Sequence, residues 1–285
     1  MRNMMRSWDS PSPLEYFATL VERDADFPLF EAAVCLGQDE YPELDYQATL
    51  TEVDRICARV RRRIPQDAGS LQRLQILNQY FFRELGFGVN ANDYYEPDNS
   101  YIHKVLETRR GIPVSLGVLW LEIASNLGLS VRGVGFPGHF LVKVHLPIGQ
   151  AVIDPASGKS LSAEQLSEML SQVQPDQAPL SAWEVAGSPV LRSAQPREIV
   201  ARMLRNLKGV FEAHGDWERL LWVQERLIVL LPEVWSEYRD RGLAHAALGH
   251  SEQAVADLEC YLVHTDEIAD NEAIAGRIES LRANR

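Results

Sequence analysis

Residues 109–129 read RRGIPVSLGVLWLEIASNLGL, which predicts a helix at the centre of the fold. After Pro113, apolar residues occupy nearly every side of a helical wheel, which is typical of a helix that is buried all round. Gly128 predicts the end of the helix, because glycine favours the left-handed conformation found there. Ser115, at the helix start, is either a helix-capping residue or part of a functional site.

Three strand-like runs follow this helix. They are SVRGVGF (130–136), HFLVKVHL (139–146) and QAVIDP (150–155). The turn-forming sequence PIG separates the last two, which predicts an antiparallel hairpin. LSAEQLSEMLSQV (161–173) predicts another helix. A buried helix packed on a small antiparallel sheet indicates an α+β fold.

The first part of the chain, about 1–88, predicts helices. Asp45 is placed to cap one helix and Pro65 to stop it, while Gly86 ends a second helix that begins at Ser70. The two apolar stripes are Leu50, Val53, Ile56, Val60 and Ile64, and then Leu71, Leu74, Leu77, Phe81 and Leu85. With the helix and hairpin of about 89–173, this region is expected to form a first domain at 1–175.

The last part of the chain repeats itself. Residues 205–232 align with 239–266 at an offset of 34, which places Gly215 on Gly249 and Leu227 on Tyr261. This region resembles the tetratricopeptide repeat family, whose helix-turn-helix unit has that period. We expect a repeat domain at 197–285, with a proline-rich linker at 176–196.

Alternation along the hairpin points to a site. In one strand the side chains of Phe140 and Val142 point to one face and that of His139 to the other. In the next strand the side chains of Ile153 and Asp154 point to opposite faces. If Ile153 joins the Phe140 face in the core, Asp154 lies on the side of His139. A carboxylate beside an imidazole fixes the tautomer of a general base. Each residue also has an ordinary structural interpretation as a cap, an incidental strand histidine or a turn residue.

A helix with Ser115, a strand with His139 and a strand with an Asp-Pro sequence resemble the core of the transglutaminase-like superfamily, which has a papain-like architecture. The stretches NDYYEPDNSYIHKVLETRRGIPVSLGVLWLEIASNLGL, GVGFPGHFLVKV and IDPASGKSLS resemble its bacterial SirB-type branch. The resemblance implies that Ser115 occupies the nucleophile position, His139 that of the base and Asp154 that of the orienting carboxylate. The superfamily nucleophile is cysteine, whereas this chain has serine.

Polar residues before Ser115 are candidates for lining the same cleft. The amide of Asn99 could join the backbone of Ser115 in an oxyanion hole. The alternative is that these side chains cap turns and pin a long loop. The candidates are Asn92, Asp93, Tyr95, Asn99, Arg109 and Arg110.

Composition narrows the function classes. A formal net charge of −12 argues against nucleic acid as a partner. The sequence has no apolar run of about 18 residues, so no membrane span is predicted. The interrupted N-terminal sequence does not resemble a secretory signal, and three scattered cysteines fit a reducing compartment, so we expect a cytoplasmic protein. We expect no metal or cofactor, because metal-ligand spacings and nucleotide-binding glycine motifs are absent from the sequence.

Three functions remain open. The leading hypothesis is a regulatory factor that keeps the cleft but not its chemistry, and that binds a protein or peptide through its repeats. The alternative is a serine-dependent amidase, peptidase or acyl-transfer enzyme using Ser115, His139 and Asp154. The third is a structural scaffold. A contact between the Ser115 hydroxyl and His139 would favour the enzyme.

Overall fold

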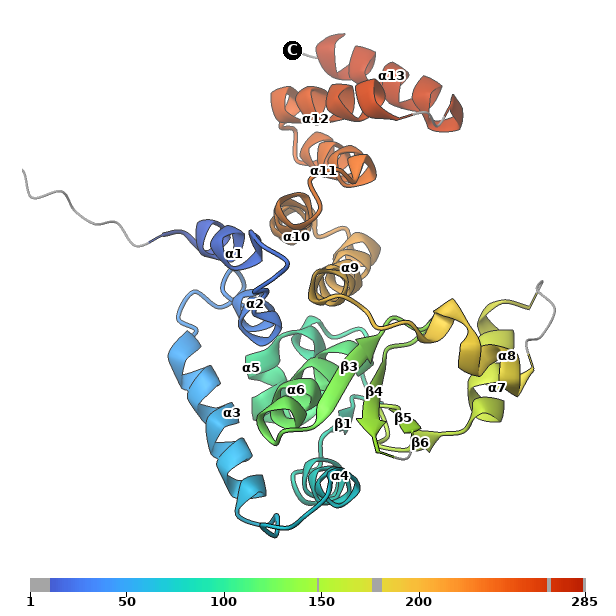
Figure 1. Ribbon diagram of the computed structural model, residues 1–285. Coiled ribbons are helices and arrows are strands. Elements are labelled where there is room, and N and C mark those ends of the chain that lie inside the picture. Colours follow the sequence, from blue (N-terminus) through green and yellow to red (C-terminus); the bar gives the residue numbers. More distant parts are fainter. Residues whose placement is uncertain (1–10, 148, 176–180, 266–267, 284–285) are drawn as a thin grey trace, which may run out of the picture. The chain divides into compact units, whose positions relative to one another are not determined.

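The computed structural model describes residues 11–147, 149–175, 181–265 and 268–283. These residues form two compact units. The larger unit is Pro28–Asp216, and the smaller one joins the described residues up to Phe27 with those from Trp217 onward. The larger unit combines helices with all the described strands, so the predicted α+β fold is confirmed (Figure 1).

The larger unit begins with the predicted helices. They are α2 (Leu29–Cys35), α3 (Tyr46–Arg61) and α4 (Ser70–Asn78), and a π-helical segment, η1 (Gln79–Glu84), continues α4. Asp45 caps α3 as predicted, because its side chain accepts the N–H of Ala48 at 2.8 Å. The wider turn of η1 was not predicted. It contains two consecutive buried aromatic residues, Tyr80 and Phe81.

Helix α6 (Pro113–Asn126) forms the centre of this unit. Its residues are almost all buried, as its all-round apolar pattern predicts. In the irregular stretch before it, the short helix that the sequence indicates from Ser100 to about Thr108 is α5 (Ile102–Thr108). The same stretch contains three elements that the sequence did not reveal. They are β1 (Gly88–Val89), the 3-10 turn η2 (Pro97–Ser100) and β2 (Arg110–Gly111), which pairs with β1 in parallel.

An antiparallel sheet follows α6. Its strands are β3 (Ser130–Val134), β4 (Leu141–Leu146), β5 (Gly149–Ile153) and β6 (Ser160–Leu161), in that order across the sheet. Val142 lies opposite Ile153 in the β4–β5 pair, which is the register that the alternation predicts. The short strand β6 is the one addition to the predicted hairpin and its neighbour.

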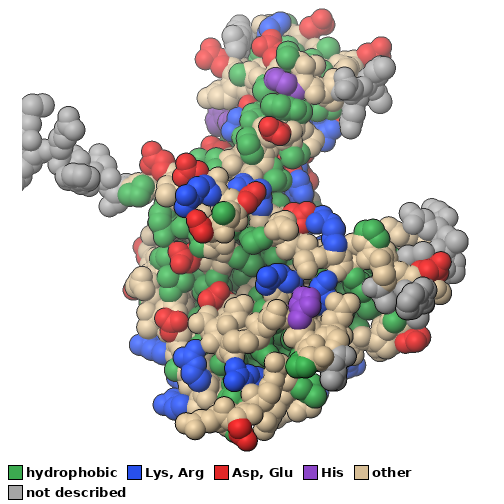
Figure 2. All heavy atoms as spheres, viewed as in Figure 1, with side chains coloured by type: hydrophobic (Ala, Val, Ile, Leu, Met, Phe, Trp, Pro, Cys, Tyr) green, Lys and Arg blue, Asp and Glu red, His purple; other side chains and the backbone are tan. Residues whose placement is uncertain are grey.

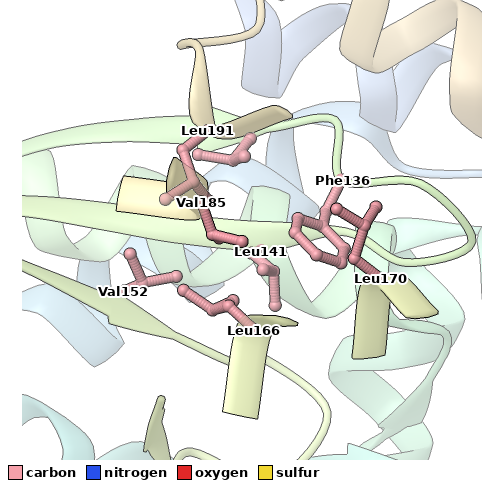
Figure 3. Close-up of a cluster of buried hydrophobic side chains, with 8 residues drawn as sticks. Phe136, Leu141, Val152, Leu166, Leu170, Val185 and Leu191 are labelled. Atoms are coloured by element: carbon pink, nitrogen blue, oxygen red, sulfur yellow. The ribbon is translucent and has the colours of Figure 1, made fainter. Parts of the chain in front are cut away.

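Helices bury both faces of this sheet. Helix α6 contacts β3 and β4 on the first face. The second face is covered by α7 (Ala163–Val173), α8 (Ala182–Gly187) and the 3-10 turn η3 (Pro189–Leu191). Figure 3 shows the resulting cluster. Its buried members are Val134, Phe136, Leu141, Val152, Leu166, Leu170, Val185 and Leu191.

The predicted linker at 176–196 does more than connect. Residues 176–180 lie outside the described part, but Val185 and Leu191 belong to the buried cluster on the sheet. The following helix α9 (Pro196–His214) also belongs to the larger unit and contacts α2 and α6. The compact unit thus ends later than the predicted domain. That 197–285 forms a domain of its own stays a prediction.

The smaller unit is helical. It contains α1 (Pro13–Val21), α10 (Trp217–Leu230), α11 (Trp235–Ala247), α12 (Ser251–His264) and α13 (Ile268–Ala283). Gly249 of this unit has a positive φ of 78°, and Gly215, one period earlier in the larger unit, has a positive φ of 65°. Helices α11 and α12 approach closely at Gly242, where a Cβ would lie 2.9 Å from Cγ of Leu258. The helices and turns of the predicted repeat are present.

Candidate functional site

His139 and Asp154 meet at one end of the β4–β5 hairpin. His139 ends the turn before β4, and Asp154 directly follows β5. His139 Nε2 lies 2.8 Å from Oδ1 of Asp154, so the contact predicted from alternation is confirmed. Both residues lie just beyond the strands rather than within them. The antiparallel register brings the two positions together even though they are 15 residues apart in sequence.

Asp154 is held as a carboxylate by several donors. Oδ1 also accepts the N–H of Ala156 at 2.9 Å, and Oδ2 accepts the hydroxyl of Ser157 at 2.7 Å. Burial pushes the pKa of Asp154 upward, but the hydrogen bonds from His139, Ser157 and Ala156 outweigh it and hold the pKa below its ordinary value. A fixed carboxylate orients the imidazole.

The other ring nitrogen of His139 is available. Among the described residues, Nδ1 has no hydrogen-bond partner, and the side chain is 23% exposed. An imidazole oriented by a carboxylate at one nitrogen can donate or accept a proton at the other. The pair can therefore act on a ligand group that reaches Nδ1, either as a hydrogen-bonding site or as an acid-base catalyst.

Ser115 is in a different environment. It is fully buried in the first turn of α6, and Oγ lies 2.6 Å from the carbonyl oxygen of Asn99. Oγ also lies 3.1 Å from both the backbone nitrogen and the carbonyl oxygen of Ile112. Gly111 makes room for it, because a Cβ there would lie 2.8 Å from Oγ. Within the described residues, each hydrogen bond of the hydroxyl goes to the backbone and none to His139.

Helix α6 nevertheless lies close to the His139–Asp154 pair. The contact is at Gly117, where a Cβ would lie 2.5 Å from Cε1 of Phe140 and 3.5 Å from Cγ of Pro155. Phe140 and Pro155 are the residues directly after His139 and Asp154. The structure therefore brings together the three elements of the predicted site, but the Ser115 side chain is bonded to the loop before α6.

Asn99 pins that loop. Its Nδ2 donates to the carbonyl oxygens of Asp93 at 2.7 Å and Tyr94 at 3.2 Å, and its Oδ1 accepts Nδ2 of Asn90 at 3.2 Å. The side-chain amide of Asn99, which was a candidate for an oxyanion hole, is thus hydrogen-bonded to residues of the loop. Ser115 belongs to the same arrangement, since its hydroxyl bonds the carbonyl of Asn99.

The other predicted lining residues lie along the same segment. Asn92, Asp93 and Tyr95 are exposed. Arg110 donates from Nη1 to the carbonyl oxygen of Gly86 at 2.7 Å. Arg109 has a positive φ of 62° and places its guanidinium 4.8 Å from the ring centroid of Phe87. In the described part of the chain none of them bonds to His139 or Asp154, so their role in a cleft stays a prediction.

Two residues near the His139–Asp154 pair were not predicted from the sequence. Ser157 bonds Asp154, and its position three residues after an aspartate is a turn signal that could have revealed it. Arg202 of α9 donates from Nη1 to the carbonyl oxygen of Phe136 at 3.2 Å. It is 63 residues beyond His139, and no local pattern connects the two.

Comparison with known proteins places the chain in a family. A model of the transglutaminase-like superfamily matches residues 47–205, which include the paired His139 and Asp154. The chain belongs to the transglutaminase-like superfamily. A tetratricopeptide repeat model matches residues 207–283 of this superfamily member. No solved structure matches the chain.

Its relatives cover almost the whole chain. A UPF0162 protein from Xylella fastidiosa is 35% identical over 92% of either chain. The UPF0162 protein YchA of Escherichia coli is 27% identical, over 90% of this chain and 96% of its own length. Protein SirB1 of Salmonella typhimurium is 28% identical with the same coverage. The predicted resemblance to the SirB-type branch is confirmed.

The described residues contain neither a candidate membrane span nor a candidate metal site. No helix there combines the length and the apolar character that a bilayer crossing needs. In the same part of the chain, no group of three or more His, Cys, Asp or Glu side chains is arranged to hold a metal ion.

Proposed function

We propose that this transglutaminase-like protein is a protein-binding factor that uses its site for recognition and does not use Ser115 as a nucleophile. The observation that carries the proposal is the environment of the Ser115 hydroxyl, which is fully buried and bonded to backbone atoms of Asn99 and Ile112. A serine nucleophile needs a base that takes its proton during attack. Here the proton is directed to a carbonyl oxygen.

The repeat region supports a role in binding. Tetratricopeptide helices stack into extended surfaces that hold peptides or proteins. Residues 233–285 contain 11 acidic and five basic side chains, which favours a basic partner for this surface. We place the protein in the cytoplasm on the grounds of its cysteine usage, since its few cysteines lie far apart in the sequence.

A serine-dependent amidase, peptidase or acyl-transfer enzyme is the second candidate. The His139–Asp154 pair favours it, because the carboxylate is oriented as a general base requires. In this mechanism Ser115 would attack an acyl carbon while His139 takes its proton. The hydroxyl would first have to leave the carbonyl of Asn99, which would lose a buried hydrogen bond.

Labelling with active-site probes distinguishes the two candidates. The full chain is treated with a serine-reactive fluorophosphonate, with Ser115→Ala as the control, and the modified residue is located by mass spectrometry. We expect no labelling at Ser115. Labelling of the wild-type chain that disappears in Ser115→Ala would contradict the proposal and support the enzyme.

A cysteine at this position gives a second readout. Burial raises the pKa of a thiol, so Ser115→Cys should alkylate with iodoacetamide no faster than the half-buried native Cys260. Its rate should be unchanged when His139→Ala is added. A fast reaction that slows in the double variant would show that His139 can activate position 115, which would contradict the proposal.

A further inference from the structure

Arg202 lies at the turn that carries His139. Its Nη1 donates to the carbonyl oxygen of Phe136 at 3.2 Å, and the backbone N–H of His139 donates to the same oxygen at 3.0 Å. The guanidinium of Arg202 and the backbone N–H of His139 therefore share one acceptor. The turn fixes the position of the arginine relative to His139.

No acidic side chain in the described part of the chain pairs with the guanidinium of Arg202. Among the described residues, the carbonyl of Phe136 is its one hydrogen-bond acceptor, although a guanidinium has five N–H donors. Arg192, in the same unit, is by contrast paired with Glu198 at 2.6 Å. Arg202 is half-buried, and this burial lowers the pKa of its guanidinium. A partly dehydrated arginine with unused donors is suited to a carboxylate, which it can bind through two parallel hydrogen bonds.

Exposed side chains with apolar surface lie near this arginine and near the turn that it contacts. Tyr94 is 45% exposed and close enough to Arg202 for an electrostatic interaction between the two side chains. Val173, at the end of α7, is 49% exposed and packs on Gly138, next to His139. Figure 2 shows that basic and hydrophobic side chains are interspersed on the face in view. Charge and apolar surface are thus combined in one place.

We infer that Arg202, with Tyr94 near it and Val173 on the turn that it contacts, binds an acidic side chain of a partner peptide whose neighbouring residues are apolar. The inference rests on the proposed binding function and names the ligand of that site. An internal glutamate or aspartate fits better than a chain terminus, because terminal carboxylates are typically captured by clusters of backbone N–H groups. Here the unused donors belong to a side chain.

Three peptides test this on the full chain. They are acetyl-Ala-Leu-Glu-Leu-Ala-amide, the same peptide with Gln in place of Glu, and the Gln peptide with a free C-terminal carboxylate. Because the protein carries a net charge of −12, non-specific attraction does not favour the acidic peptides. We expect the Glu peptide to bind about tenfold more tightly than its Gln counterpart, as a charge-assisted hydrogen bond predicts. Calorimetry measures the affinities, and shifts of the His139 and Gly138 amide signals locate the site.

Variants assign the preference to one residue. Arg202→Gln should abolish the preference for Glu, whereas Arg205→Gln, at an exposed position of the same helix, should leave it unchanged. Arg202→Lys keeps the charge but not the two-donor geometry, and should retain part of the preference. Thermal unfolding confirms that each variant is folded.

The outcomes are distinct. Equal affinity for the Glu and Gln peptides would overturn the inference. Arg202 would then have only the structural role of hydrogen-bonding α9 to the turn. A preference for the free C-terminus over the Glu side chain would overturn the choice of ligand. Neither result touches the proposed function, which fails instead if fluorophosphonate labels Ser115.

Discussion

Ser115 and the His139–Asp154 pair are parts of one predicted triad, yet the fold places them in opposite environments. The serine is fully buried and bonded only to backbone among the described residues, whereas the histidine is partly exposed and has one free nitrogen. The pair is formed between side chains at the open end of a hairpin. The serine instead joins a loop to the first turn of a helix.

This difference separates two kinds of polar residue. A hydroxyl in the first turn of a helix satisfies backbone groups that lack partners inside the helix. An imidazole with an oriented carboxylate and an exposed nitrogen is available to a ligand. The order of Ser115, His139 and Asp154 along the chain does not by itself give them a shared role. The surroundings of each side chain decide what it can do.

The largest expected effect concerns the packing that the two regions share. The ring of Phe140 fits between Gly117 of α6 and Gly133 of β3 and is 1% exposed. Phe140→Ala should lower the free energy of unfolding by about 3–5 kcal/mol, because it leaves a cavity between helix and sheet. Urea unfolding measures the loss. A loss below about 1 kcal/mol would show that α6 and the hairpin are not one packed body.

Removing the Ser115 hydroxyl tests whether its buried hydrogen bonds stabilise the fold. Ser115→Ala leaves the carbonyl of Asn99 without this buried donor, and should cost about 1–3 kcal/mol of unfolding free energy. Ser125→Ala, at an exposed position on the same helix, should change stability by less than about 0.5 kcal/mol. If the two substitutions lowered the free energy of unfolding equally, the hydrogen bond from Ser115 to Asn99 would not stabilise the fold.

The sequence could predict most of the secondary structure that surrounds the site. The apolar pattern of 113–126 predicted a buried helix, and the alternation in 139–155 predicted the register that joins His139 to Asp154. Both inferences work because a helix or strand has a fixed period, so one buried position determines the direction of its neighbours.

The rest depends on contacts between distant segments. The burial of Ser115 follows from Asn99, which is held by the loop at 90–94, and a pattern of turn-forming residues does not specify such a fold. The role of Arg202 requires α9 to pack beside the 136–139 turn. The stretch at 176–196 resembled a linker because it is rich in proline, yet Val185 and Leu191 complete the core.

A methyl group at Gly117 tests how closely α6 must approach the pair. In Gly117→Ala the new Cβ would overlap the buried ring of Phe140 at 2.5 Å. Overpacking costs about 1–3 kcal/mol, and the higher helix propensity of alanine offsets up to about 1 kcal/mol of it. We expect a net loss of about 1 kcal/mol in thermal unfolding. Gly135→Ala, where a Cβ meets nothing within 4 Å, is the control and should be nearly neutral.

The smallest expected effect is the dependence of stability on pH at Asp154. Its folded pKa is held below the ordinary value of 3.8, because the hydrogen bonds from His139, Ser157 and Ala156 outweigh burial. The stabilisation is therefore present above pH 3.8 and is lost as the pH falls through the lower, folded pKa. Asp154→Asn should be less stable than the wild-type chain by on the order of 1 kcal/mol at pH 7, and the difference should shrink in acid. Ser157→Ala, which removes one donor, should give an intermediate curve. Urea unfolding at several pH values between 2 and 7 measures the difference, and parallel curves for the wild type and Asp154→Asn would mean that the carboxylate is not held by these bonds.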